Sequence, residues 1–212
     1  MVNYGEAFRM PFTDLKKLLI GIVLQLIPIV NFISFGYQLE CAKSAMEKKF
    51  ELPEWKKWLN LFVKGIIGFV ISIIYMIPAI IILLLVAASL FSVLTSGLVG
   101  GMGRMSAVSG MFSTLGITAI IVFILLLISI YIIPSALMAY VKNGNFTSAF
   151  KFGEVFKKAL NLNYFLIWIV AMLYYLILSG VLSIIPYIGT SIGAFIAGVT
   201  SMSLFGELYS EK

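Results

Sequence analysis

The chain has 212 residues, of which 61% are hydrophobic and only 11% are charged. Soluble domains carry about 25% charged residues, so this composition excludes an ordinary globular core. A membrane-spanning helix needs about 20 mostly apolar residues, and the length therefore allows roughly four to six spans without a separate soluble domain. The net charge of +6 favours membrane lipids with anionic headgroups as partners, and we expect no nucleic acid.

Residues 1–17 mix charged and apolar side chains and predict a short interfacial segment that Pro11 interrupts. Residues 18–38 form the first apolar stretch, with Pro28 and Asn31 near its centre. A proline inside a helix removes a backbone hydrogen bond and clashes with the preceding turn. The stretch is therefore either one kinked span or a re-entrant hairpin that enters and leaves on one side.

Residues 39–64 are polar and basic. Behind Pro53, which favours the first position of a helix, apolar residues recur at helical spacing and lysines fall mostly on the other side. The apolar positions are Trp55, Trp58, Leu59 and Phe62, and the lysines are Lys56 and Lys57. This pattern predicts an amphipathic elbow helix that lies flat at the membrane surface, with both tryptophans at headgroup depth.

Residues 65–94 and 117–141 predict two further spans. The segment 95–116 between them holds six glycines and several serines, a composition that predicts a flexible loop. Residues 142–160 repeat the basic and aromatic pattern and predict a second elbow helix, with Lys157 and Lys158 at the headgroups. Residues 162–185 span again, and after a turn at Pro186 the final helix covers residues 188–206.

Together these elements predict an all-α integral membrane protein with one membrane domain over residues 1–212 and four or five transmembrane helices. An internal duplication is also expected, with units at about 18–94 and 117–185. Residues 21–36 resemble residues 180–193 when aligned on Pro28 and Pro186. Paired helix breaks of this kind point to a transporter site, but the favoured interpretation is two turns at a membrane edge.

The most specific packing pattern lies in the final helix, where small residues recur every four positions. They are Gly189, Gly193, Ala197 and Ser201. Small side chains let two helix backbones approach closely. The pattern predicts a tight helix crossing, either within the fold or between two copies of the chain.

The chain contains no histidine and one cysteine, and we find no catalytic, metal-binding or cofactor-binding constellation in the sequence. The predicted spans also lack ionisable residues, which proton- or ion-coupled transporters usually carry. We therefore expect no enzyme and no cofactor.

Orientation follows from the rule that short loops rich in Lys and Arg stay cytoplasmic. If residues 18–38 form a hairpin, 14 of the 15 Lys and Arg residues lie on one side, and only Arg104 lies opposite. If they cross the membrane, the division is 11 against four. Both arrangements predict a multi-pass protein of the cytoplasmic membrane with cytoplasmic elbow helices, and the hairpin satisfies the rule better.

Residues 15–65 carry a recognisable pattern: Ile20-Gly21, Ile27-Pro28, Gly36-Tyr37, Leu52-Pro53-Glu54-Trp55 and Phe62-Gly65. It resembles an uncharacterised, mainly archaeal family of polytopic membrane proteins, known only as a domain of unknown function. The resemblance implies a small integral protein of the cytoplasmic membrane and supplies no reaction or substrate.

Two functions remain in competition. The first is a non-enzymatic membrane protein that associates with itself, with lipid or with a membrane protein partner. The alternative is a channel or transporter for a small solute, with a site near the breaks at Pro28 and Pro186.

Overall fold

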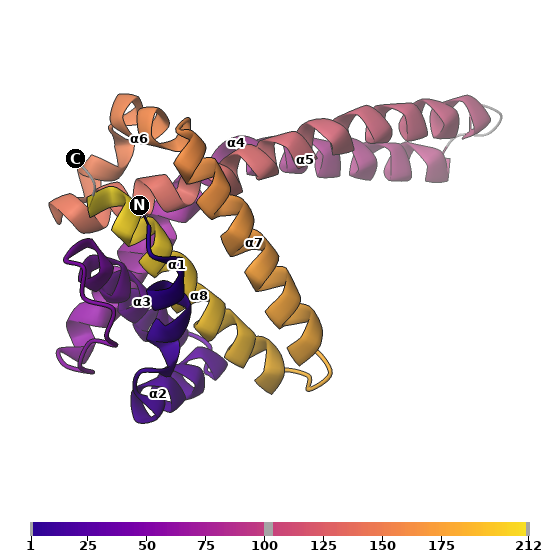
Figure 1. The fold of residues 1–212 in the computed structure, drawn as a ribbon. Coiled ribbons are helices and arrows are strands. Elements are labelled where there is room, and N and C mark those ends of the chain that lie inside the picture. The colour runs from indigo at the N-terminus through magenta and orange to yellow at the C-terminus, as the bar shows by residue number, and fades with distance from the viewer. Residues whose placement is uncertain (1, 100–103, 211–212) are drawn as a thin grey trace. The chain divides into compact units, whose positions relative to one another are not determined.

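Helices form the regular secondary structure of the described part of the chain. The structure is a computed structural model that describes residues 2–99 and 104–210, with the backbone alone for residues 92–99 and 104–115. In chain order the helices are α1 (Tyr4–Arg9), η1 (Met10–Phe12), α2 (Leu15–Leu26), α3 (Asn31–Met46), α4 (Trp58–Val99), α5 (Arg104–Asn143), η2 (Phe146–Phe150), α6 (Phe152–Ala159), α7 (Leu162–Leu182) and α8 (Ile188–Ser210) (Figure 1).

Four helical segments are long and apolar enough to cross a membrane. They are Trp58–Phe91, Gly116–Asn143, Leu162–Leu182 and Ile188–Ser210. At 1.5 Å per residue, even the shortest covers about 30 Å, which matches the hydrocarbon core of a bilayer. The chain is therefore an all-α, multi-pass membrane protein, as the composition predicts.

The chain divides into two units, which are described separately. Unit 1 comprises Met1–Ser72 and Ile132–Lys212, and unit 2 comprises Ile73–Tyr131.

Helix α8 is the central helix of unit 1. It packs along α3 and α7 and also contacts α1 and α2 (Figure 1). Its most apolar window is 56% buried, against 11% in each of the other three spanning segments, so those segments keep most of their apolar surface for lipid. The core cluster of unit 1 consists of Met10, Leu18, Ile22, Tyr37, Cys41, Leu52, Leu61, Phe195, Ile196 and Val199.

The apolar stretch at residues 18–38 forms a helical hairpin. Asp14 caps α2 by accepting hydrogen bonds from the backbone N–H groups of Lys16 and Lys17, and the helix ends at Leu26. After the break, α3 packs back against α2, and Ser34 Oγ donates to the carbonyl of Gly21 at 3.3 Å. In a continuous helix these two residues would lie about 20 Å apart, so the stretch folds as a helical hairpin and not as one kinked helix. That the hairpin re-enters the membrane stays a prediction.

The turns that follow the two aligned prolines have the same backbone form. The residue directly after each proline, Ile29 or Tyr187, has a positive φ, of 71° and 62° respectively. The matching hydrogen bonds run from Asn31 N–H to Ile27 O and from Gly189 N–H to Ile185 O, both at 2.9 Å. The local sequence similarity thus has a structural counterpart, whereas the larger duplication stays a prediction.

Unit 2 contains the distal part of α4, with Pro78 inside the helix, and the first part of α5. Ser129 Oγ of α5 donates to the carbonyl of Tyr75 in α4 at 2.9 Å. The flexible loop predicted for residues 95–116 is wrong, because α4 continues to Val99 and α5 begins at Arg104. Residues 100–103 lie outside the described residues.

Of the two predicted elbow helices, the first is absent from the structure and the second basic segment contains a short helix. Residues 52–57 are not helical, and the helix that begins at Trp58 runs without interruption into the first spanning segment. Lys57 has a φ of 56°, which a helix that opens at Pro53 does not allow. The first elbow helix is therefore wrong as predicted. The second basic segment does contain a separate short amphipathic helix, α6, after the 3-10 helix η2.

Candidate functional site: the basic end of unit 1

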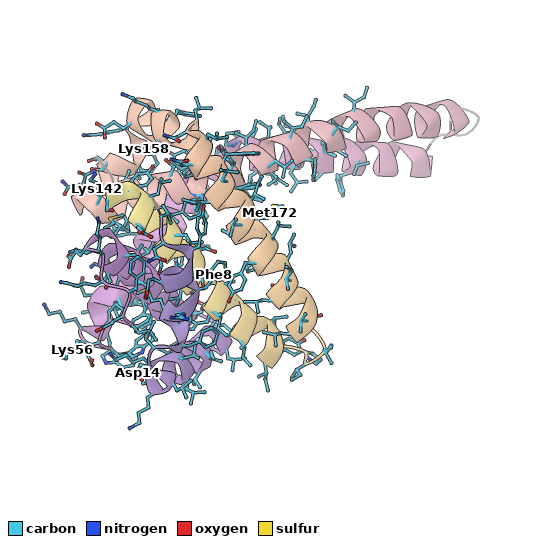
Figure 2. All side chains as sticks on the ribbon, viewed as in Figure 1. Phe8, Asp14, Lys56, Lys142, Lys158 and Met172 are labelled. Carbon is cyan, nitrogen blue, oxygen red and sulfur yellow. The ribbon has the colours of Figure 1, made fainter. Side chains whose placement is uncertain are left out.

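Lysines from both basic segments of the sequence come together at one end of unit 1, which we call the basic end. Its members are Lys43, Lys64, Lys142, Lys157 and Lys158. Lys142 Nζ donates to the carbonyl of Tyr209 at 3.1 Å, and Lys158 Nζ lies 5.4 Å from the centroid of the Tyr209 ring. The last turns of α5 and α8 therefore meet α6 there, and Figure 2 shows both lysines.

A hollow of about 80 Å³ opens at the basic end. It is lined by Leu39, Glu40, Lys43, Lys64, Tyr140, Val141 and Gly144. Glu40 and Lys64 form an ion pair across its wall, and their side chains are 27% and 29% exposed respectively. Two ammonium groups and one carboxylate give the lining a net charge of +1. Among the described residues no three Cys, Asp or Glu side chains are placed to hold a metal ion.

A buried polar network positions the end of α5 against α6 and α8. Pro134 removes the helical hydrogen bond at its own position, and the next residue, Ser135, bonds to three other elements. Its N–H donates to the Tyr164 phenol oxygen at 3.2 Å, and its hydroxyl donates to the carbonyl of Val155 at 2.9 Å. The same hydroxyl is hydrogen-bonded to the Tyr209 phenol. The network therefore holds Tyr209 where Lys142 and Lys158 contact it.

The N-terminal segment lies along α8 and ends beside its C-terminal turn. The backbone N–H of Asn3 donates to Glu207 Oε2 at 2.8 Å, and Ser203 Oγ lies 2.9 Å from Met10 Sδ. Glu207 is only 7% exposed. Lys64, Lys142 and Glu207 lie near the ends of the apolar segments Trp58–Phe91, Gly116–Asn143 and Ile188–Ser210. Each is just outside the span bounds predicted from the sequence.

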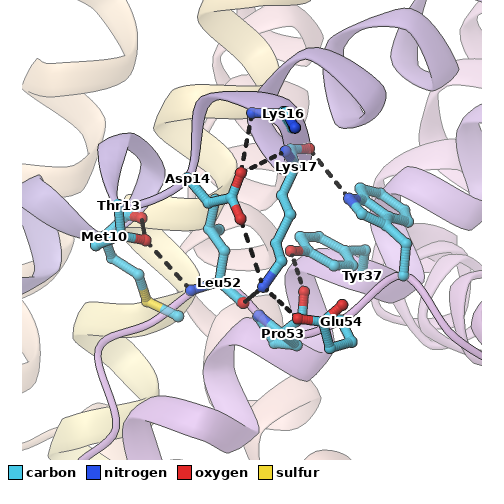
Figure 3. A network of polar contacts seen from close by, with 10 residues as sticks. Met10, Thr13, Asp14, Lys16, Lys17, Tyr37, Leu52, Pro53 and Glu54 are labelled. Carbon is cyan, nitrogen blue, oxygen red and sulfur yellow. Dashed lines mark hydrogen bonds and ion pairs between the residues drawn. The ribbon is translucent and has the colours of Figure 1, made fainter.

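The segment that replaces the first elbow helix, residues 47–57, folds over the α2–α3 hairpin, and we call it the strap. Lys17 Nζ donates to the carbonyl of Leu52 at 2.9 Å and lies 2.8 Å from Glu54 Oε1 and 3.7 Å from Asp14 Oδ2 (Figure 3). The hydrogen bond to Glu54 raises the pKa of Lys17. The same bond lowers the pKa of Glu54, and the hydrogen bond from the Lys17 backbone lowers the pKa of Asp14.

Aromatic packing completes the strap. The Trp55 ring stacks on the Tyr37 ring, with centroids 3.7 Å apart and planes 6° apart. Tyr37 OH donates to the carbonyl of Pro53 at 2.7 Å, and Trp55 Nε1 donates to the carbonyl of Lys17 at 3.1 Å. Trp55 is therefore half-buried and holds the strap in place, in contrast to the surface position that helical spacing indicated.

The other candidate interface residues are accessible. Trp58 is 44% exposed, and Lys56, Lys57 and Lys157 are exposed as well. Lys56 lies apart from Lys142 and Lys158 in Figure 2. Their contact with headgroups stays a prediction.

The two glycines of the small-residue pattern in α8, Gly189 and Gly193, face α7 inside the fold. A Cβ added to Gly193 would lie 3.5 Å from the Leu178 carbonyl, and one added to Gly189 would overlap the carbonyl of Leu182. Ala197 is fully buried and Ser201 is half-buried. The described crossing is therefore the one between α7 and α8 of the same chain.

A tighter crossing escaped the sequence analysis. Gly36 of α3 and Gly65 of α4 face each other, and a Cβ on either would overlap the partner helix's backbone, at the carbonyls of Leu61 and Phe32 respectively. Both glycines, Tyr37 and the Leu-Pro-Glu-Trp run of the strap belong to the sequence pattern of residues 15–65. That pattern was the available signal, and the structure shows that Gly36 meets Gly65 and that Tyr37 contacts Pro53 and Trp55.

A comparison with protein families identifies the family of the chain. The family model described as "Protein of unknown function (DUF4013)" matches residues 20–187, and the chain belongs to this family. No curated protein and no solved structure matches the chain.

Proposed function

We propose that this protein is a non-enzymatic membrane protein that binds anionic lipid headgroups through its basic end. The observation that carries the proposal is that lysines of α3, α4, α5 and α6 meet at one end of unit 1, around Tyr209 and the hollow. A lysine near an anionic membrane surface contributes about 1 kcal/mol of binding free energy. Several lysines at one end therefore favour an anionic leaflet over a neutral one.

The cytoplasmic face of the cell membrane is the side that fits this arrangement. Asn3 lies beside Glu207 at the C-terminal end of α8, and Lys142 reaches the same helix end. If α8 crosses the bilayer, the N-terminal segment and the basic end share a side. That supports the hairpin arrangement, which leaves only Arg104 opposite and agrees with the rule for positive charges.

The test compares the purified protein in lipid nanodiscs of phosphatidylcholine alone with the same discs doped with phosphatidylglycerol. We expect phosphatidylglycerol to raise the thermal stability of the protein, since a ligand that binds the folded state stabilises it. Added salt should reduce the difference, because salt screens exposed charges. Equal melting temperatures in the two lipids, at low salt, would contradict the proposal.

One observation favours a solute pathway as a second candidate function. At the hairpin break, Gln25 Oε1 and Asn31 Oδ1 are buried and accept no hydrogen bond from the described residues. Buried polar atoms without a partner are rare and call for an explanation, and a polar solute or ion passing the break at Pro28 is one. Flux measured in proteoliposomes should then fall in Asn31→Leu, and absence of any flux in the native protein would rule this candidate out.

A further inference from the structure

We propose that the hollow of the basic end binds the phosphodiester group of one lipid with an anionic, hydroxyl-bearing headgroup, of the phosphatidylglycerol type. The inference rests on the proposed function, because it assigns a single lipid to a defined site on the surface that faces anionic headgroups. The hollow is lined by charged side chains of two helices and by the last turn of a third. Its charge, shape and depth each fit this ligand.

The charge of the hollow complements a phosphodiester. Glu40 and Lys64 neutralise each other in their ion pair, and Lys43 lies three residues after Glu40, on the same face of α3. Lys43 is exposed and forms no ion pair within the described part of the chain. The excess charge of +1 therefore lies at the Lys43 ammonium group, and a phosphodiester carries a charge of −1.

The shape leaves room for the ligand. Gly144, with a φ of 71°, ends α5 at the rim of the hollow, and a Cβ added there would meet nothing within 4 Å. The apolar part of the walls is formed by the buried side chains of Leu39 and Tyr140. Because these walls exclude water from one side, hydrogen bonds from the lysines to a phosphate oxygen are stronger there than on an open surface.

The depth of the hollow matches that of a headgroup. Its lining includes Tyr140 and Gly144, where the apolar segment Gly116–Asn143 ends. Spanning helices end at the headgroup region. A phosphate at this level accepts hydrogen bonds from the Nζ atoms of Lys43 and Lys64, and the Glu40 carboxylate accepts one from a headgroup hydroxyl.

The test counts bound lipid by native mass spectrometry while phosphatidylglycerol is titrated into the protein in neutral phosphatidylcholine. The variants are Lys43→Ala, its charge-preserving counterpart Lys43→Arg, and Lys157→Ala as the matched control, which removes an exposed lysine of the basic end outside the hollow. We expect Lys43→Ala to weaken retention of one phosphatidylglycerol between about tenfold and a hundredfold. Lys157→Ala should weaken it by about fivefold or less, and Lys43→Arg should retain it.

The outcomes distinguish a defined lipid site in the hollow from a general attraction of the basic end to anionic lipid. Equal losses in Lys43→Ala and Lys157→Ala would overturn the defined site and leave the general attraction to anionic lipid standing. Absence of any preference for phosphatidylglycerol in the native protein would overturn both. Inorganic phosphate serves as the second probe, in neutral lipid. Stabilisation by phosphate that depends on Lys43 and exceeds that by phosphatidylglycerol would identify a soluble phosphate as the ligand and overturn the lipid assignment.

Discussion

The crossing of α3 and α4 at Gly36 and Gly65 offers the sharpest mutational test of the fold. A Cβ placed on Gly36 would lie 2.7 Å from the carbonyl carbon of Leu61 and 3.0 Å from the backbone nitrogen of Gly65. Carbon atoms prefer separations of about 3.5–4.0 Å. Gly36→Ala therefore increases the distance between the two helices by about 1 Å. The obstacle is backbone on both sides, and no side-chain rotation relieves it.

The expected cost follows from measurements on overpacked cores. An added methyl group that forces backbone shifts typically costs about 1–3 kcal/mol. For a chain of this length that corresponds to a drop of roughly 2 to 12 °C in melting temperature. Gly65→Ala should cost a similar amount, because its Cβ meets the Phe32 carbonyl in the same way. The double variant should cost less than the sum, since the helices have already separated.

The measurement is thermal unfolding in one detergent or bicelle, with Gly180→Ala as the matched control. Gly180 also lies within an apolar helix, α7, but a Cβ there meets nothing within 4 Å. We expect the control to equal or exceed the native protein, because alanine favours a helix more than glycine does. If Gly36→Ala melts at the same temperature as Gly180→Ala, α3 and α4 do not cross at these glycines.

Three further predictions concern α8 and the strap. Gly193→Ala should fold normally, since its Cβ makes ordinary contacts at 3.5 Å, whereas Gly193→Leu should lower the thermal stability by about 1–3 kcal/mol; equal stabilities would show that α7 does not pack there. Tyr37→Phe removes the hydrogen bond to the strap and should cost about 1 kcal/mol in equilibrium unfolding, and an unchanged midpoint would contradict that contact. The pKa of Glu54 is lowered from the ordinary glutamate value of 4.5. Its contact with Lys17 therefore stabilises the fold at pH values above 4.5, and this stabilisation is lost as the pH falls below 4.5. An acid titration followed by tryptophan fluorescence should show the strap loosening in the native chain, and Glu54→Gln should reduce that change; a titration curve identical in both would refute the role of Glu54.

The parts of the fold that depend on local chemistry were predictable from sequence. The apolar segments have few alternatives in lipid, because only a helix satisfies the backbone there. Pro28 and Pro186 mark breaks because proline cannot continue a helix without loss. The loop predicted at residues 95–116 failed because glycine weakens a helix by about 1 kcal/mol relative to alanine without ending it.

The parts that depend on distant partners were not predictable. Helical spacing placed Trp55 on an elbow helix, but stacking on Tyr37 and a hydrogen bond to Lys17 outweigh that local preference. Lys43 and Lys142 lie at the same end of unit 1 because of how α3, α5 and α8 pack. The hydrophobic periodicity of the sequence does not predict this packing. The sequence pattern of residues 15–65 did contain the strap and the glycine crossing, but it did not say which of its members touch.

The side of the membrane occupied by the basic end is tested most directly by thiol labelling in sealed, right-side-out membrane vesicles. In a Cys41→Ala background, single cysteines are placed by Gly5→Cys in α1, Lys157→Cys in α6 and Ile184→Cys at the α7–α8 turn, where Ile184 is 83% exposed. We predict that an impermeant reagent labels the cysteine at position 184 in intact vesicles, and labels those at positions 5 and 157 only after the vesicles are opened. Labelling at position 157 in intact vesicles, or positions 5 and 157 on opposite sides, would contradict a cytoplasmic basic end.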